Sequence, residues 1–311
     1  MDTGDHEVSA VGKETPERDE MAEIPSRRIT DAVSELYWRI NVRLPDDVLS
    51  AIRTAADEET SETARDILSQ LLENQEASRE EGLPLCQDTG TAIAFVEVGR
   101  DLHISGEPIA EAVSRGVAEA CEKYPLRTSM VADPIERANT GDNTPAVVHL
   151  RQVEGTGLTV HQTVTGVQTC ALPISENMSR LHMLSPADGR DGIIEAAVKT
   201  VREAGANACP PVIVGVGAGG TFCTATALAR RALLRPLDGE NEDDELAALE
   251  RDILEAVNDL GIGPMGLGGR TTALGAMVET APCHIASMPV AVNLGCHAHR
   301  HSEFTLQPDG E

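Results

Sequence analysis

The chain has 311 residues, 41% of them apolar, which is enough for one large or two modest domains with a substantial core. Its 51 acidic residues against 25 basic ones give a net charge of −26, which argues against nucleic acids and anionic membranes as partners because both would repel it. Only three of the basic residues are lysines and 22 are arginines, and an acidic surface with so few lysines predicts a halophilic source.

No stretch approaches the roughly 18 apolar residues that a membrane span needs. The acidic N-terminal segment also lacks the apolar centre of a signal peptide, so we expect a soluble, cytoplasmic protein. Seven cysteines at unequal spacings, without a secretion signal, indicate thiols, metal ligands or packing rather than a disulfide framework.

The first part of the chain is predicted to be an extension followed by helices. Residues 1–28 combine many charges with few apolar groups, which indicates a disordered extension. The domain proper is expected over 29–311, beginning with a helical subdomain at 29–82. Its helical patterns lie at residues 30–40, 44–59 and 61–80.

The remaining residues, 83–311, are predicted to be an α/β catalytic part. Strand patterns lie at 91–99, 146–162, 210–217 and 284–301. Helix patterns lie at 107–124, 191–205, 224–235 and 245–261, and a further helix-like run ends at 184. Together they predict an α+β (mixed α/β) fold, with a helical subdomain followed by a mixed helix and sheet region.

A glycine motif in VIVGVGAGGTF, residues 212–222, could indicate dinucleotide binding. Gly215, Gly217 and Gly220 have the spacing G-x-G-x-x-G between a strand and a helix, and Asp238 follows about 20 residues later. However, the helix runs into an acidic connector and another helix, so the second strand of a β-α-β unit is missing. We therefore favour a tight turn in which the glycines allow close backbone approach.

Four segments rich in Asp, Asn, Arg, Thr, Gly and Pro are candidates for a functional site. They cover residues 83–92, 126–149, 207–222 and 261–300, and three of them carry a cysteine at a loop boundary: Cys86, Cys209 and Cys296. A lone cysteine is usually a small buried apolar residue, but joint placement in three such loops favours a shared role. The packing interpretation is kept for Cys121 and Cys223, while Cys283, adjacent to His284, is left unassigned with a structural role favoured.

These segments resemble the α subunit, or N-terminal domain, of the iron–sulfur (class I) fumarase and L-tartrate dehydratase family. The blocks CQDTG, RxSxVADP, NTGDNTP, CPP and HIAxxPVAVNxxCHxxR occur in order within about residues 30–302. The resemblance implies that Cys86, Cys209 and Cys296 each bind one iron of a [4Fe–4S] cluster, whose fourth iron lacks a protein ligand. Such an iron can bind the carboxylate and hydroxyl groups of a 2-hydroxy dicarboxylate as a Lewis acid.

The resemblance also implies roles for side chains around the cluster. Gln87 and Asp88 would contact the substrate and take part in proton transfer; the structural alternative for Asp88 is a turn carboxylate. Arg127 would clamp a substrate carboxylate, with a surface ion pair as its alternative. His284 would assist acid–base chemistry, and judged alone it could equally be a core histidine. Asn177, in the segment SENMS, would bind substrate.

Residues that follow the last cysteine, His297, His299 and Arg300, are candidates for groups that surround the cluster ligands. The residues Asp133, Asn139, Asp142 and Asn143 are expected to hold turns around the cavity without a role that we can specify.

The activity implied by the resemblance is the reversible hydration of fumarate to (S)-malate, a tricarboxylic acid cycle step, with L-tartrate dehydration as the alternative. The chain ends soon after CHAHR and so corresponds to the cluster-binding half, from which we expect a β subunit partner and a hetero-oligomer. Two alternatives of another class stay open: a Rossmann-type nucleotide-binding oxidoreductase built on residues 215–220, and a non-catalytic iron–sulfur interaction protein.

One stretch departs from the family. Before SENMS the family usually has a lysine and a Gly-rich turn of the type KGGGSENMS, whereas residues 164–174 read VTGVQTCALPI here. These eleven residues are the in-frame translation of a common sequencing-library adapter. We interpret them as a sequence artefact and assign no role to Cys170; the alternative is a natural loop variant with a redox cysteine.

Overall fold

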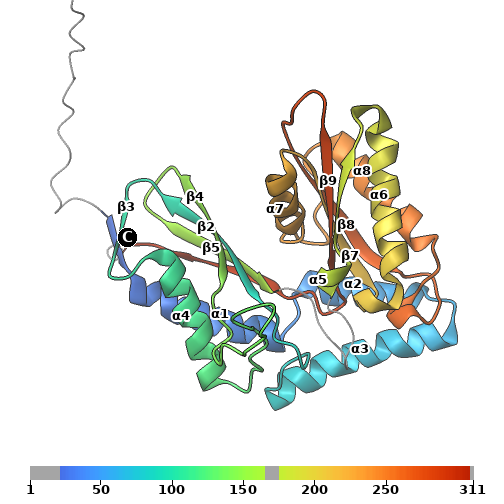
Figure 1. The fold of residues 1–311 in the computed structure, drawn as a ribbon. Coiled ribbons are helices and arrows are strands. Elements are labelled where there is room, and N and C mark those ends of the chain that lie inside the picture. Colours follow the sequence, from blue (N-terminus) through green and yellow to red (C-terminus); the bar gives the residue numbers. More distant parts are fainter. Residues whose placement is uncertain (1–21, 165–174, 309–311) are drawn as a thin grey trace, which may run out of the picture.

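The computed structural model describes residues 22–164 and 175–308, which form two lobes joined by helices (Figure 1). The helices are α1 (Ser26–Val42), α2 (Asp46–Glu58), α3 (Glu62–Glu81), α4 (Ile109–Lys123), α5 (Ser175–Met178), α6 (Gly189–Ala204), α7 (Phe222–Ala232) and α8 (Asp244–Asn258). The strands are β1 (Ala22–Pro25), β2 (Ala92–Gly99), β3 (Leu102–Ser105), β4 (Val147–Val153), β5 (Leu158–Val164), β6 (Arg180–Leu184), β7 (Val212–Gly219), β8 (Ala273–Ala281), β9 (Met288–Gly295) and β10 (His301–Leu306). Short 3₁₀ turns are η2 (Pro186–Asp188), η3 (Gly205–Ala208) and η4 (Pro264–Gly266). The expected α+β class is confirmed.

The first lobe is a four-stranded sheet, in the order β10-β5-β2-β4, with α1 and α4 on one face. Strand β5 runs antiparallel to β2 and β10, while β4 runs parallel to β2. Because side chains alternate along a strand, Ala94 and Val96 enter the core under the helices while Phe95 and Glu97 lie on the other face. Gly116 lets the two helices pack closely, since a Cβ there would lie 2.7 Å from Thr30 O.

The second lobe is a sheet in the order β6-β9-β7-β8, covered by α7 on one face and by α6 and α8 on the other. The central strand β7 is buried along its whole length, which fits its continuous run of apolar residues and glycines. Its residues Val214 and Val216 face α6 and α8, so that one core lies on that side. Helix α8 begins at an N-cap, where Asp243 accepts hydrogen bonds from Glu245 N and Leu246 N.

A third, smaller core lies at the junction of the lobes and includes residues of α2 and α3. Helix α3 begins after the N-cap Ser61 and ends at Gly82, whose φ of 63° is the left-handed conformation that glycine accepts. Helix α1, by contrast, belongs to the core of the first lobe. The three N-terminal helices expected as one subdomain are therefore divided between two cores.

The N-terminal boundary also differs from the expected one. Residues 22–25 form β1, which pairs in parallel with β3, and Ile24 within it is fully buried. Helix α1 then begins at Ser26, whose Oγ accepts a hydrogen bond from Glu107 N. Residues 22–28 are thus structured, and the rest of the expected extension, 1–21, lies outside the described residues. None of the helices described is both long enough and apolar enough to cross a bilayer.

Candidate active site

The pairing of β7 with β9 brings two of the three candidate cysteines together. Ile213, near the start of β7, pairs with Gly295, at the end of the antiparallel β9. Cys209 precedes β7 and Cys296 follows β9, so both lie at the same end of the sheet. The backbone N–H of His297 donates to Cys209 O at 3.3 Å, which ties the two turns to each other.

The third cysteine, Cys86, lies in the loop between α3 and β2 and reaches the same place. Leu85 N donates to Asn41 O at 2.8 Å, and Asn74 donates to Leu85 O, so both α1 and α3 hold this loop. Arg300 donates to Asp88 O at 2.9 Å and thereby links the loop to the segment after Cys296. Cys86, Cys209 and Cys296 consequently share the small core at the junction of the lobes.

Burial governs the electrostatics of these thiols. It raises the pKa of Cys296 to about 12, while the nearby Arg300 lowers this pKa and the charges of Cys209 and Cys86 raise it. Burial likewise raises the pKa of Cys86, with Arg300 again acting in the opposite direction. Both thiols are therefore protonated at neutral pH without a metal, and metal binding must displace their protons.

The three cysteines are compatible with an iron–sulfur cluster. Among residues 22–164 and 175–308, no three His, Cys, Asp or Glu side chains are arranged to hold one metal ion. In an iron–sulfur cluster each cysteine binds a different iron, so the thiols must surround the cluster instead of meeting at one point. Three cysteines from three loops in one buried core, beside a buried arginine with unpaired N–H groups, meet that demand.

Asp88 and Gln87 follow Cys86 directly. Asp88 is only 6% exposed, and its Oδ1 accepts a hydrogen bond from Gly90 N at 3.1 Å. The turn role expected as its structural alternative is therefore present, and its Oδ2 makes no hydrogen bond to the described residues. Gln87 is exposed. Both residues thus share the loop of Cys86, and their expected roles toward a substrate stay predictions.

Asn143 fastens the loop that carries Arg127 to the loop that carries Cys86. The side chain of Asn143 is fully buried; its Oδ1 accepts from Ser129 N and Met130 N, and its Nδ2 donates to Gly90 O and Tyr37 Oη. Arg127 itself is exposed and forms neither an ion pair nor a hydrogen bond with the described part of the chain. Its guanidinium is consequently accessible to a carboxylate ligand.

Helix α5, at the start of SENMS, is anchored next to Cys296. Glu176 forms an ion pair with the buried Arg230 and accepts from Asn293 Nδ2, and Ser179 Oγ accepts from Leu294 N at 3.1 Å. Sequence reasoning missed Glu176 and Arg230; the only signal was an arginine in an alanine-rich helix. Asn177 is exposed and points its carbonyl to Arg180.

Within one chain His284 lies far from the three cysteines, and its expected acid–base role stays a prediction. It lies exposed in the turn between β8 and β9, where its Nδ1 accepts from Ala286 N. Cys296 lies beyond the opposite end of β9. Because an extended strand rises about 3.3 Å per residue, the eight residues of β9 separate the two by roughly 25 Å. The alternative of a core histidine is excluded by its exposure.

The cysteines outside the site differ among themselves. Cys121 packs against the first core, and burial raises its pKa to about 11, as the packing interpretation requires. Cys223 is exposed, so that interpretation is wrong for it; Cys283, left unassigned, is exposed as well. Cys170 and residues 165–174 lie outside the described residues, and the artefact interpretation stays a prediction.

The glycine motif serves packing. Gly215 and Gly217 lie inside β7 rather than in a turn, and a Cβ on Gly217 would come within 2.2 Å of Ala225 O in α7. A Cβ on Gly215 would lie 2.4 Å from Ala229 O. These glycines therefore let α7 lie flat against the sheet, as the preferred interpretation of close backbone approach requires.

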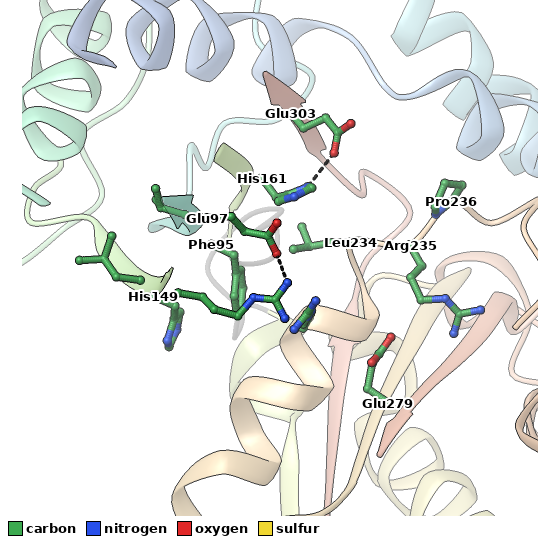
Figure 2. Close-up of a pocket in the computed structure, with 13 residues that line it drawn as sticks. Phe95, Glu97, His149, His161, Leu234, Arg235, Pro236, Glu279 and Glu303 are labelled. Atoms are coloured by element: carbon green, nitrogen blue, oxygen red, sulfur yellow. Dashed lines mark hydrogen bonds and ion pairs between the residues drawn. The ribbon is translucent and has the colours of Figure 1, made fainter. Parts of the chain in front are cut away.

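A cavity of about 340 Å³ opens on the face of the first sheet that α1 and α4 leave uncovered (Figure 2). Phe95 and His149 stack there with ring centroids 4.6 Å apart, and His161 pairs with Glu303. None of the site residues expected from the sequence lines this cavity. The chemistry of the thiols, not the size of this cavity, therefore locates the candidate active site.

Comparison with known proteins identifies the class of enzyme. The chain is a hydro-lyase, an enzyme that breaks a carbon–oxygen bond by eliminating water. More particularly, it belongs to the fumarate hydratase (fumerase) family, whose model matches residues 30–305.

Two of its relatives cover nearly the same length. The "Putative L(+)-tartrate dehydratase subunit alpha" of Methanocaldococcus jannaschii is 39% identical over 292 residues, 91% of this chain and 99% of that protein. The L(+)-tartrate dehydratase subunit alpha of Escherichia coli K12 is 33% identical over 288 residues, 91% of this chain and 92% of that protein.

Proposed function

We propose that the chain is the cluster-binding α subunit of a [4Fe–4S]-dependent hydro-lyase that interconverts fumarate and (S)-malate. Cys86, Cys209 and Cys296 would each hold one iron. The observation that carries the proposal is the convergence of these three thiols, from three separate loops, in one buried core beside Arg300. The family to which the chain belongs supports an iron–sulfur cofactor.

When bound, the cluster supplies a Lewis-acidic iron that polarises the hydroxyl group of the substrate. The chain supplies the groups that bind and orient the dicarboxylate. Arg127 would clamp one carboxylate through its planar fork, since its guanidinium is exposed and its loop is fixed by Asn143. Gln87, which follows Cys86 in the same loop, and Asn177, in α5, are both exposed and would donate hydrogen bonds from their amides.

Proton transfer is assigned to Asp88. Dehydration removes a weakly acidic proton next to a carboxylate, so it needs a base that is held in place and shielded from water. Asp88 is buried, its Oδ1 is fixed by Gly90 N, and Oδ2 is left to accept or return the proton. His284, at the far end of β9, has no place in this step within the same chain.

A β subunit is proposed to complete the enzyme. The relatives are named α subunits, and they match this chain over almost their whole length. We therefore infer a hetero-oligomer in which the β subunit supplies further carboxylate-binding groups, and we expect the chain alone to be inactive.

The substrate has one alternative, L-tartrate, because the curated relatives carry that name while the family description carries fumarate hydratase. Coexpression with the β subunit, followed by assays on fumarate, (S)-malate and L-tartrate, decides between them. Resequencing of codons 160–180 should come first, since a KGGGSEN-like segment is expected there in place of the adapter translation. If the chain is made as written, loss of that turn should impair substrate binding more than cluster binding.

Anaerobic reconstitution tests the cofactor directly. We expect iron and sulfide near four per chain, lost on Cys86→Ser, Cys209→Ser or Cys296→Ser and retained on Cys121→Ser, because Cys121 lies in the first core. Retention of the cluster in any of the three ligand variants would contradict the ligand assignment. Binding of NAD without iron would instead support the oxidoreductase alternative.

A further inference from the structure

Arg300 is a buried cation with an unfinished set of hydrogen bonds. Its side chain is 1% exposed, and Nη1 donates to Asn41 Oδ1 at 2.6 Å and to Asp88 O at 2.9 Å. Nε and Nη2 have no hydrogen-bond partner among the described residues. Nη1 of the guanidinium is therefore held by the protein, whereas Nε and Nη2 are available to donate hydrogen bonds to a ligand.

The missing partner must be an anion. A guanidinium remains charged in a protein interior, and a buried charge without a counter-charge is strongly unfavourable. No carboxylate in the described part of the chain forms an ion pair with Arg300, and the carboxylate of nearby Asp88 accepts from Gly90 N. Neutral groups, the Asn41 amide and the Asp88 carbonyl, fix the fork without neutralising it.

The groups that feel the charge of Arg300 are the candidate ligands. Its hydrogen bond to Asp88 O holds it against the loop that carries Cys86. Burial raises the pKa of Cys86 and of Cys296, and the charge of Arg300 acts in the opposite direction on both thiols. In an oxidised [4Fe–4S] core held by three thiolates, the thiolates carry more negative charge than the core carries positive charge, so the assembly is a net anion. A single fixed cation is the counter-charge that such an assembly requires in a dry pocket.

We propose that Arg300 is the counter-ion of the cluster, with Nε and Nη2 donating to its sulfur atoms, and that it thereby sets the reduction potential and the retention of the cluster. This inference rests on the proposed function. Asn41 is the positioning residue: its Nδ2 donates to Tyr37 O at 2.8 Å, which orients its Oδ1 toward Arg300. Hydrogen bonds to the sulfur atoms and fixed charges are known means of tuning such potentials.

The test uses the full-length chain reconstituted anaerobically, with Arg300→Met, Arg300→Lys and the control Arg235→Met. Arg235 pairs with Glu250 in the second lobe, so its loss removes an arginine charge away from the thiols. For Arg300→Met we expect a lower midpoint potential, since loss of a cation disfavours the more negative reduced state. We also expect cluster loss to be roughly 10- to 100-fold faster. Arg300→Lys should recover part of the potential, and Arg235→Met should leave both readouts unchanged.

Two outcomes separate the inference from the proposed function. Wild-type chain without iron and sulfide would overturn the proposed cofactor, and the inference with it. The second outcome is that the wild-type chain binds a cluster whose potential and lifetime are unchanged in Arg300→Met, while the melting temperature of the cluster-free variant is lower. Arg300 would then have a structural role only, and the proposed function would be unaffected.

A second variant keeps the arginine in place, so that the test does not depend on Arg300→Met folding. Asn41→Asp sets a carboxylate against the guanidinium with almost no change in size. We expect the cluster to shift to a lower potential, because the added negative charge offsets the arginine, while the iron content of freshly reconstituted protein stays near that of wild type. An unchanged potential in Asn41→Asp would overturn the inference.

Discussion

Replacing Asn143 with alanine is expected to destabilise the cluster-free chain by about 4 kcal/mol. The buried amide makes four hydrogen bonds, to Ser129 N (2.7 Å), Met130 N (3.1 Å), Tyr37 Oη (2.9 Å) and Gly90 O (2.8 Å). Each is worth about 1 kcal/mol net, but Tyr37 Oη keeps its own hydrogen bond to Gly90 O, so the lost bonds together cost about 3 kcal/mol. Asn143 also has a φ of 63°, a left-handed conformation that costs alanine about 1 kcal/mol more.

Urea unfolding followed by circular dichroism measures this loss. The matched control is Asn139→Ala, in the same loop, because Asn139 is exposed and water can replace its bonds to Thr128 O and Gly141 N; a change within about 1 kcal/mol is expected. In the assembled enzyme, Asn143→Ala should raise KM, since it frees the loop that carries Arg127. A loss below about 1.5 kcal/mol would refute the reasoning, because it would mean that the four bonds are replaced rather than lost.

Three further predictions address packing, pH and the position of His284. Gly217→Ala should lower the free energy of unfolding by about 1–3 kcal/mol, because the added Cβ clashes with α7. The control Gly239→Ala, whose Cβ meets only Pro236 O at 3.4 Å, should change it by no more than about 0.5 kcal/mol in the same urea assay. Equal stabilities of the two variants would contradict the packing role of Gly217. Burial lowers the pKa of His299 to about 3, below its ordinary value of 6.5, so stability is full above pH 6.5 and falls by about 1.4 kcal/mol per unit as the pH drops toward 3. His299→Gln should flatten that slope, and an unchanged slope would assign it to other groups. His284 lies beyond the far end of β9, so any catalytic contribution it makes must act at the site of a second chain. Chains with Cys296→Ser and chains with His284→Ala, when coexpressed, should therefore regain activity that each variant lacks alone. If no activity is regained, His284 has no catalytic role.

Sequence patterns located the longer elements because their signals are local. Helix α3 carries its own N-cap, Ser61, and its own C-cap glycine, Gly82, and the expected range of 61–80 differs from the observed one by a residue. Strand β7 was recognisable as a short continuous apolar run.

Strands that depend on a distant partner were missed or misread. The run that ends at 184 looked helical, yet Arg180–Leu184 is strand β6 because it pairs with β9 more than a hundred residues later. Strand β8 lies in a segment that the glycines marked as loop, and it is a strand through its pairing with β7. Local propensity does not contain this information.

The sequence points to the candidate ligands but not to the contacts that hold them in place. Three cysteines at loop boundaries are visible in the sequence, whereas the pairing of strands β7 and β9, which brings Cys209 near Cys296, is not. The family resemblance implies a role for His284 at the site, but the extended strand β9 lies between His284 and Cys296 and keeps them apart within one chain. The partners of Arg300 and Asn143 lie far away in sequence, so their buried networks appear only in the folded chain.

The location of the thiols also determines which part of the chain would be affected by loss of the proposed cofactor. Each lobe has a large core of its own, and the small core at the junction contains Cys209 and Cys296 among few apolar side chains. A ligand that binds the folded junction and not the unfolded chain stabilises the folded junction by mass action, so the proposed cofactor would hold the two lobes together. Oxidative loss of the proposed cluster would then weaken the contact between the lobes while both lobes stayed folded. The junction would become exposed and accessible to proteases.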